Sequence, residues 1–385
     1  MNTTTNTPVQ LCLALLLLVL TTTLQARELR YAMGFPPGSD SDVAAQAYAK
    51  ALSEYTDGEL TVKIYPLSLL NFAETSAGLR DGIAQVGYVL APYFPAEFPH
   101  MNLLAESSMM LQLIGDKVRG REGMAYVGAM AEYLFLHCPE CHQEFAAQKQ
   151  VFTSNAGSTP YGLTCTQPVT NQAELKGKRL RVAGSHWSRW AQHFGATPIT
   201  MSSNEALEAL NQGVVDCVII SAPELTNLGL IDAVTDITMA VPGGIFAGTG
   251  TTNVNLEVWR SLSEHERRAM IRAGAVMAAQ IPYIYHQRQD DVLAKARDEY
   301  DARIHDASPE LVAATRDFVR EDLNTIVDYY KDKHGVERGQ EMLDEFLPIL
   351  ERWVDLVQDI DSTEALAELY WKEAYSKVDV SRYGL

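Results

Sequence analysis

The sequence predicts an α/β protein of two domains that is completed by a layer of helices. Two separate stretches, residues 28–90 and 161–221, each alternate predicted strands with predicted helices, and from Ser263 onward the pattern is almost wholly helical. Such alternation is typical of largely parallel sheets with helices on their faces. At 385 residues the chain is long enough for two domains with a sizeable core.

In the first stretch, strands are expected at 28–33, 60–64 and 85–90 because apolar and polar residues alternate there. Helices are expected between these strands. The first helix carries an apolar stripe at a spacing of four residues, formed by Val43, Ala47, Ala51 and Tyr55, and the second spans 73–82. Ligands of such sheets lie beyond the carboxyl ends of the strands. The loops 34–38 and 91–99 are therefore expected to form one wall of a pocket.

The second stretch predicts strands at 162–166, 179–182 and 214–221. A helix before the last strand is indicated by a capping-box pattern from Ser202 to Glu205 and by Gly213 at its end. Residues 243–250 are rich in glycine and are interpreted as a strand that crosses between the domains. Further helices are expected to start at Ser263, at 308–309 and at 361–364. In the tail, a buried helical stripe is predicted for Met342, Phe346, Leu350, Trp353 and Val357.

The N-terminus has the pattern of a signal peptide. Residues 11–20 form an uninterrupted apolar run, and cleavage is expected after Ala26, although residues 2–10 contain no lysine or arginine. The run is too short to span a bilayer, which takes about 20 residues. Cys12 lies at the front of the run, which is the wrong position for lipid attachment. We therefore expect a soluble, periplasmic protein of residues 27–385.

The formal net charge of −18 argues against nucleic acid or an anionic membrane as a partner, because both require a basic patch. An overall negative field also repels anionic small molecules. If the ligand is an anion, a local and well-placed cation must hold it.

Four cysteines follow the expected signal peptide: Cys138, Cys141, Cys165 and Cys217. In an oxidising compartment an even number predicts disulfides, here two, with three possible pairings. The segment from Cys138 to His142 also satisfies C-x-x-C-H, the pattern of covalent haem attachment, so a periplasmic haem or redox protein is an alternative. A structural disulfide between Cys138 and Cys141 is favoured over haem, since haem would displace the packing of an α/β domain. Zinc at these cysteines and His142 is a third possibility.

Known enzyme motifs are incomplete in this sequence. His265 and Glu266 begin a zinc-protease pattern, but Ala269 stands where the second histidine belongs. The glycine-rich segment 243–250 lacks the lysine of a phosphate-binding loop, and Ser185 is not flanked by a G-x-S-x-G elbow. We expect no enzymatic activity, no cofactor and no metal.

The segment from Leu175 to Ala222 resembles the signature of the solute-binding proteins of tripartite ATP-independent periplasmic (TRAP) transporters, the DctP family. The matching positions follow the family's order and spacing: Gly177, Arg181, Val182, Gly195, Ala196, Pro198, Glu205, Ala209, Leu210, Gly213, Val215 and Asp216. Weaker similarity extends over nearly the whole chain after the signal peptide.

The resemblance implies a two-lobed periplasmic-binding-protein fold, similar to type II, with a long connecting helix and a C-terminal helical layer. Lobe I would comprise residues 27–155 and 248–285, lobe II residues 156–247 and 286–335, and the C-terminal helices 336–385 would pack on the lobes. It also implies a partner, a membrane permease that receives the ligand from the cleft. A sensor that presents its closed form to a receptor kinase is a further alternative. We expect a monomer.

In that family, an arginine at the position of Arg181 forms a two-pronged bridge to the carboxylate of the ligand. A guanidinium suits this role because its paired donors match a carboxylate and its charge persists on desolvation. On its own, a strand-end arginine could equally pair with an acid at the surface. Arginine and anion-binding positions of other members fall near Tyr93 and Tyr161 here, which favours a monocarboxylate with an apolar or aromatic remainder.

The loops and strand ends supply the other expected ligand contacts. These are Phe35, Leu90, Tyr93, Tyr161, Ser185, Ser203, Ile220 and Ser221. Glu224 is a further expected contact, which could hold a cation beside the ligand as a glutamate does in some members of the family. The family fold also places the strands of Cys165 and Cys217 side by side, which implies the second disulfide.

Overall fold

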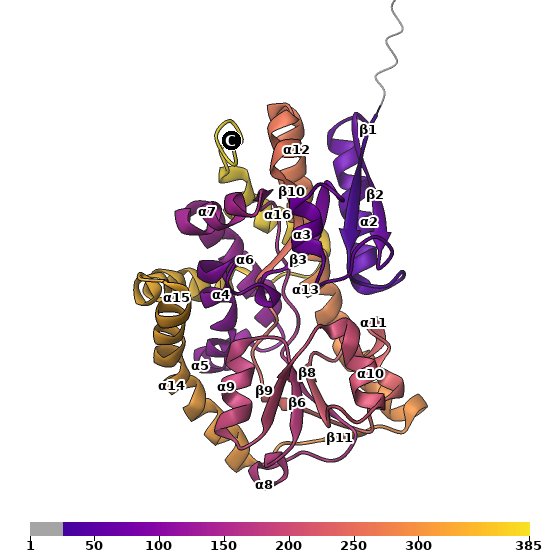
Figure 1. Ribbon diagram of the computed structural model, residues 1–385, viewed down its shortest axis with the longest axis vertical. Helices are drawn as coiled ribbons and strands as arrows, with labels where there is room; N and C mark the ends of the chain where they lie inside the picture. The colour runs from indigo at the N-terminus through magenta and orange to yellow at the C-terminus, as the bar shows by residue number, and fades with distance from the viewer. Residues whose placement is uncertain (1–25) are drawn as a thin grey trace, which may run out of the picture.

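The computed structural model describes residues 26–385, so the expected signal peptide, including Cys12, lies almost entirely outside the described residues. Two sheets occupy the two halves of the molecule, and helices cover both (Figure 1). Within residues 26–385, no helix is long and apolar enough to cross a membrane.

The first sheet has the order β2-β1-β3-β10-β4. Its strands are β1 (Arg27–Met33), β2 (Leu60–Pro66), β3 (Val86–Leu90), β4 (Gln150–Val151) and β10 (Thr249–Asn255). The first three pair in parallel, as the alternating pattern predicted. Strand β10 runs antiparallel to both β3 and β4, because it returns from the second lobe.

Helices pack around this sheet. They are α2 (Asp40–Tyr55), α3 (Thr75–Arg80), α4 (Pro99–Glu106), α5 (Leu111–Ile114), α6 (Glu122–Leu136), α7 (Pro139–Ala147) and α12 (Leu256–Ser261), with short 3₁₀ turns η1 (Ala91–Tyr93), η2 (Ser108–Met110) and η3 (Asp116–Val118). The buried face of α2 differs from the predicted one: Val43 is 52% exposed, and Tyr48 is fully buried against Tyr31. The buried face is centred on Tyr48 because Ala44, Ala45 and Leu52 pack together with it.

The second sheet has the order β11-β9-β5-β8-β6-β7. Its strands are β5 (Gly162–Cys165), β6 (Arg179–Val182), β7 (Thr197–Thr200), β8 (Cys217–Ile220), β9 (Asp236–Pro242) and β11 (Arg303–His305). The helical elements of this lobe are α8 (Gln172–Leu175), α9 (Ser185–His193), η4 (Ser203–Glu205), α10 (Ala206–Asn211), α11 (Glu224–Asn227) and η5 (Leu230–Asp232). The predicted capping box is not formed: the Ser202 side chain accepts from the N–H of Asn204, and a 3₁₀ turn precedes α10.

Residues 243–250 are interpreted above as a crossing strand, but only Thr249 and Gly250 lie in a strand, β10. Residues 243–248 form an irregular link from β9 in one sheet to β10 in the other. The two ends of this link cannot continue a strand, because Gly243, Gly244 and Gly248 all have positive φ angles. The link is also tightly packed, since a Cβ atom on Gly244 would lie 2.8 Å from Cγ of Met109. Backbone of this kind suits a connection between two lobes.

One long helix joins the halves. Helix α13 (Glu264–Tyr300) begins with the capping box predicted at Ser263 and Glu266, packs on α2 and α6, and leads into β11 of the second sheet (Figure 1). The last helices are α14 (Pro309–His334), α15 (Gly339–Leu356) and α16 (Thr363–Glu373), followed by a short 3₁₀ turn, η6 (Tyr375–Lys377).

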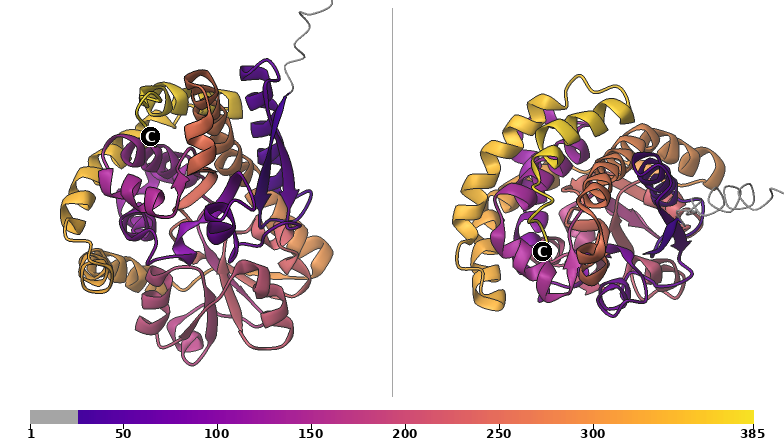
Figure 2. Two further views of the ribbon diagram at one scale, coloured as in Figure 1. Left: turned by 45° about the horizontal axis from the view of Figure 1, so that its top comes forward. Right: turned by 90° about the horizontal axis from the view of Figure 1, so that it is seen from above.

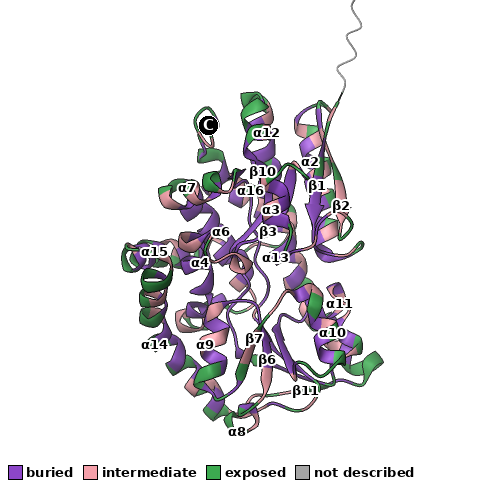
Figure 3. Ribbon diagram, in the orientation of Figure 1, coloured by how far each residue is buried: buried purple, intermediate pink, exposed green. Residues whose placement is uncertain are grey.

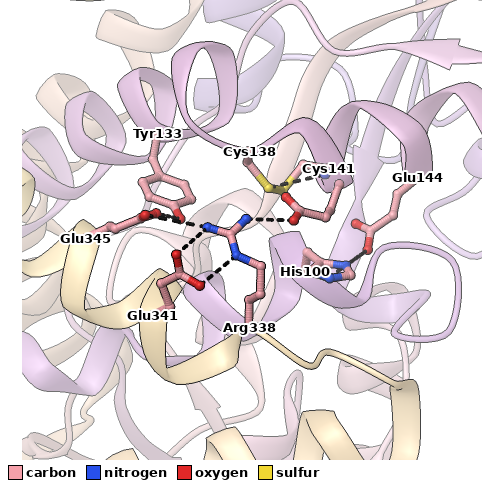
Figure 4. A network of polar contacts seen from close by, with 9 residues as sticks. His100, Tyr133, Cys138, Cys141, Glu144, Arg338, Glu341 and Glu345 are labelled. Carbon is pink, nitrogen blue, oxygen red and sulfur yellow. Dashed lines mark hydrogen bonds and ion pairs between the residues drawn. A yellow bond between two sulfur atoms is a disulfide. The ribbon is translucent and has the colours of Figure 1, made fainter.

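The C-terminal helices form an arc along one side of the molecule (Figure 2, right). Their inner faces are buried and their outer faces exposed (Figure 3), and the predicted stripe of α15 from Met342 to Val357 is confirmed as core. Arg338 fixes the start of α15: its guanidinium donates to Glu140 of α7 at 2.7 Å and to Glu341 at 2.8 and 3.1 Å (Figure 4).

Both expected disulfides are present. Cys138 bonds to Cys141 at the start of α7, close to the Arg338 network (Figure 4), and Cys165 bonds to Cys217 across the paired strands β5 and β8. With both sulfur atoms bonded to each other, Cys138 and Cys141 have no thiol left for haem attachment or for zinc. The ring of His142 contacts the carbonyl oxygen of Leu134 at 2.6 Å instead, so the haem and zinc alternatives are wrong for this structure.

The two disulfides are expected to contribute unequally to stability. Cys165 and Cys217 are 52 residues apart, whereas Cys138 and Cys141 are three apart, and a longer closed loop restricts the unfolded chain more. Replacing Cys165 and Cys217 by alanine should lower the free energy of unfolding by about 4 kcal/mol, against about 2 kcal/mol for the other pair. Urea unfolding of the two double variants measures this, and equal losses would contradict it.

Candidate functional site

A cavity of about 40 Å³ lies between the two sheets, where strands and loops of both lobes meet. The first lobe contributes the ends of β1 and β3, the second lobe the ends of β6 and β8, and α13 closes one side. Its lining residues are Phe35, Tyr88, Leu90, Tyr93, Ala156, Gly157, Ser158, Tyr161, Arg181, Ser203, Ile220, Glu224, Leu228, Phe246, Thr249, Ile281 and Tyr285. The cavity is smaller than usual ligand sites of roughly 300–1,000 Å³, so the lobes are closely apposed in this conformation.

Arg181 is the cation of the cavity. It lies near the end of β6 and is only 1% exposed, because the strand carries it into the space between the lobes. Its Nε and Nη2 donate to the carbonyl oxygen of Met201 at 3.1 and 2.9 Å, and Nη2 also donates to the Tyr93 hydroxyl at 2.8 Å. Within residues 26–385, no carboxylate forms an ion pair with it. Arg179, at the start of the same strand, instead pairs with Asp216 at 2.7 Å.

Tyr93 connects the two lobes at this point. It comes from η1 of the first lobe, whereas its hydroxyl accepts from Arg181 and from the N–H of Ser203 at 3.0 Å, both in the second lobe. A further bond across the cleft runs from the Asn204 side chain to the carbonyl oxygen of Gly34 at 2.9 Å. These contacts hold the lobes together over the cavity.

Aromatic rings form most of the remaining wall. Phe35 meets Tyr88 edge-on at 5.5 Å between ring centres, and Tyr161 stacks on Trp187 at 4.4 Å with the rings almost parallel. The Tyr161 hydroxyl stays neutral, since burial raises its pKa well above the ordinary value. The cavity therefore combines one permanent cation with apolar surfaces, a usual composition for small-molecule sites.

The structure brings together eight of the ten expected contacts: Phe35, Leu90, Tyr93, Tyr161, Arg181, Ser203, Ile220 and Glu224. Ser185 lies outside the cavity, because its N–H and hydroxyl both donate to the buried carboxylate of Glu106. Ser221 is fully buried and is not part of the lining.

Sequence reasoning missed several lining residues, among them Tyr88, Phe246 and Tyr285. Tyr88 could have been found, since it lies two residues before Leu90 on β3 and side chains two apart share a face. Tyr285 could not, because it reaches the cavity from α13, more than sixty residues beyond Ile220.

Glu224 is the acid of the cavity. It begins α11, is 6% exposed, and accepts a hydrogen bond from the Tyr285 hydroxyl at Oε1 at 2.6 Å. Its pKa is raised from 4.5 to about 7, because burial and the nearby Asp40 carboxylate outweigh the opposite effects of Tyr285, Asn227 and Arg181. Among the described residues, no group of three or more histidine, cysteine, aspartate or glutamate side chains could hold a metal ion.

This raised pKa makes the stability depend on pH. Between pH 4.5 and 7 folded Glu224 keeps a proton that the unfolded chain loses, so the wild type should become less stable as the pH rises through this window. Glu224→Gln cannot titrate, and its stability relative to the wild type should increase by about 3 kcal/mol from pH 4 to pH 8. Urea unfolding of both proteins across this range measures it, and a difference independent of pH would show that the carboxyl group titrates normally.

Comparisons with known proteins agree with this geometry. The family described as bacterial extracellular solute-binding protein, family 7 (DctP), matches residues 142–329, which include β6, Arg181 and Glu224. A solute-binding protein of Roseobacter denitrificans is 22% identical over 260 residues, which are 60% of this chain and 67% of the relative.

Solved structures of TRAP-type receptors share the fold. A solute-binding protein of Rhodoferax ferrireducens in complex with benzoate has a TM-score of 0.73 at 14% identity, covering 86% of this chain and 100% of that one. A Bordetella bronchiseptica protein with bound (R)- and (S)-mandelate has a TM-score of 0.70 at 21% identity, with 85% and 99% covered. A Bordetella pertussis receptor that binds pyroglutamic acid has a TM-score of 0.66 at 21% identity, with 84% and 100% covered.

The family match, the two-sheet fold and the position of the cavity between the lobes lead to one conclusion. Residues 142–329 carry the DctP family match, and the described chain has the fold of TRAP solute-binding proteins, which are extracytoplasmic solute receptors.

Proposed function

We propose that this receptor captures a small monocarboxylic acid with an apolar or aromatic remainder and delivers it to the membrane permease of a TRAP transporter. The observation that carries the proposal is the guanidinium of Arg181, which is buried in the cavity and bonded only to neutral oxygen atoms among the described residues. A buried charge without an ionic partner is costly, and a ligand carboxylate removes that cost. Nη1 of Arg181 makes no hydrogen bond to the described residues and is available for the ligand.

The walls of the cavity favour one carboxylate over two. The positions near which other family members carry additional anion-binding groups are Tyr93 and Tyr161, and a tyrosine side chain supplies no positive charge. Within the lining, Arg181 is the only arginine or lysine. A second carboxylate would be buried without a cation, at a cost of several kcal/mol.

The acids bound by similar proteins are consistent with this class. Benzoate, mandelate and pyroglutamate each have a single carboxylate on a compact ring or ring-bearing body, and they are ligands of the Rhodoferax and Bordetella proteins. The ring systems would pack against Phe35, Tyr88 and Phe246 here.

Binding would be coupled to movement of the lobes. We place lobe I at residues 27–155 and 248–285, lobe II at 156–247 and 286–335, and the C-terminal helices at 336–385. Tyr93 is bonded to Arg181 across the cleft, so entry of an acid of this size requires the lobes to separate and then close on it. Ligand contacts to both lobes would favour the closed form by population shift.

The decisive variants replace Arg181. Titration calorimetry with benzoate, mandelate and pyroglutamate should detect binding of at least one acid to the wild type. Arg181→Ala should weaken that binding about a hundredfold or more, and Arg181→Lys about tenfold, because lysine keeps the charge but loses the paired donors. Dicarboxylates such as succinate should bind more weakly than the best monocarboxylate.

Arg179 provides a matched control on the same strand. It pairs with Asp216 outside the cavity, so Arg179→Ala and Arg179→Lys should leave the affinity unchanged. Unchanged affinity in Arg181→Ala, for an acid that the wild type binds, would refute Arg181 as the anchor.

A further inference from the structure

The cavity contains a second polar group, the carboxyl group of Glu224, with an oxygen atom that accepts no hydrogen bond from the described residues. Oε1 of Glu224 accepts from Tyr285, but Oε2 is buried and has no hydrogen-bond partner among the described residues. Glu224 lines the same cavity as Arg181 and is more than nine-tenths buried. Buried polar atoms are nearly always satisfied in folded proteins, so an oxygen of this kind on a cavity wall points to a donor that comes from the ligand.

Neighbouring donors of the chain are already engaged elsewhere. Arg288 forms an ion pair with Asp40 and also donates to the Thr226 hydroxyl at 3.3 Å. The Asn227 side chain donates to Asp40 at 3.1 Å and to Tyr285 at 3.2 Å. It lies close enough to Glu224 to lower the pKa of that carboxyl group, but it makes no hydrogen bond to Oε2. The other ionisable groups that act on Glu224 and its partner Tyr285 are Arg181 and Tyr88. The Glu224 carboxyl group therefore lacks a bonded cation of its own.

The chemistry of the site favours a neutral donor. Glu224 belongs to no cluster of three or more potential metal ligands in the part of the chain that is described. A ligand ammonium group would have to be desolvated against an acid whose charged form burial already disfavours. A hydroxyl or an amide N–H has a much smaller desolvation cost and can donate to Oε2 when the acid is charged, as it is above its pKa of about 7.

We infer that Glu224 is a specificity-determining residue, which selects monocarboxylic acids that carry a hydroxyl or amide N–H at a distance from the carboxylate. The inference rests on the proposed function, because it assumes that Arg181 holds the carboxylate end. A site built to hydrogen-bond a substrate group discriminates strongly against an analogue without that group, since the polar atom of the protein is then left unsatisfied.

The test compares acids that differ by one hydroxyl group. Affinities of benzoate, 3-hydroxybenzoate and 4-hydroxybenzoate are measured by titration calorimetry at pH 8 for the wild type and Glu224→Gln. We expect the better hydroxybenzoate to bind the wild type at least about tenfold more tightly than benzoate. In Glu224→Gln the amide oxygen can still accept from Tyr285, and the NH₂ group that replaces Oε2 can donate to the ligand hydroxyl. A charge-assisted hydrogen bond thus becomes a weaker neutral one, so the ratio should fall at least about threefold.

Two controls separate this effect from damage to the fold. Glu122→Gln removes another partly buried acid, which lies on α6 outside the cavity, and should preserve the wild-type ratio. Melting temperatures of both variants establish that they are folded. All titrations are repeated with EDTA and with choline chloride in place of sodium chloride.

Each outcome has a distinct meaning. If benzoate binds in an Arg181-dependent manner but neither hydroxyl raises the affinity, the inference about Glu224 is refuted and the proposed function stands. A preference that is undiminished in Glu224→Gln also refutes it. A preference that disappears when sodium or a divalent cation is removed refutes it in favour of a bound cation. If none of these three acids binds in an Arg181-dependent manner, and mandelate and pyroglutamate do not either, the proposed function and this inference both fail.

Discussion

The site is organised around one constraint, a permanent positive charge enclosed between two lobes. The Arg181 guanidinium is 1% exposed and has neutral oxygen atoms as its hydrogen-bond partners among the described residues. Removing an ion from water without an ionic partner costs several kcal/mol, whereas an arriving carboxylate restores a short, charge-assisted pair. The unpaired charge thus lowers the stability of the empty protein and raises its affinity for a carboxylate. The wall of the cavity then has to supply little more than a shape that fits the rest of the ligand.

The rest of the molecule keeps that charge in place. The net charge of −18 repels anions from the surface, so the cavity is the place where an anion gains most from entering. Strand β6 is fixed between β7 and β8, and β8 is itself linked to β5 by the Cys165–Cys217 disulfide. On the other side of the cleft, Tyr93 is presented by the turn after β3, and α13 and the C-terminal arc give that lobe its rigid backing (Figure 2). Closure can then bring two rigid surfaces together around Arg181.

Local sequence patterns predicted most helices and strands, whereas the buried face of a helix and the contacts of single side chains depend on tertiary packing. The alternation at 28–33 and the capping box at Ser263 depend on neighbours in sequence, and both are found as expected. The exposed position of Val43 was not predictable from spacing, because two overlapping stripes on α2 fit the same period and only packing against Tyr31 selects one. Ser185 was misplaced for a similar reason: its partner, Glu106, comes from the other lobe. The signature around Arg181 located a residue of the cavity, but Tyr285 reaches the cavity from a helix that the signature does not include.

Arg181 and Glu224 together set the charge that the cavity tolerates. A monoanion neutralises Arg181 and leaves Glu224 as an acid whose pKa of about 7 lets it be neutral or charged at little cost near neutral pH. A dianion would place a second negative charge beside Glu224, so that Glu224 would have to bind a proton. This proton uptake would make the binding free energy less favourable. A neutral molecule would leave the guanidinium unpaired. The electrostatics of these two side chains therefore favour a single carboxylate, and the free Oε2 atom of Glu224 favours a neutral donor at the opposite end of the same ligand.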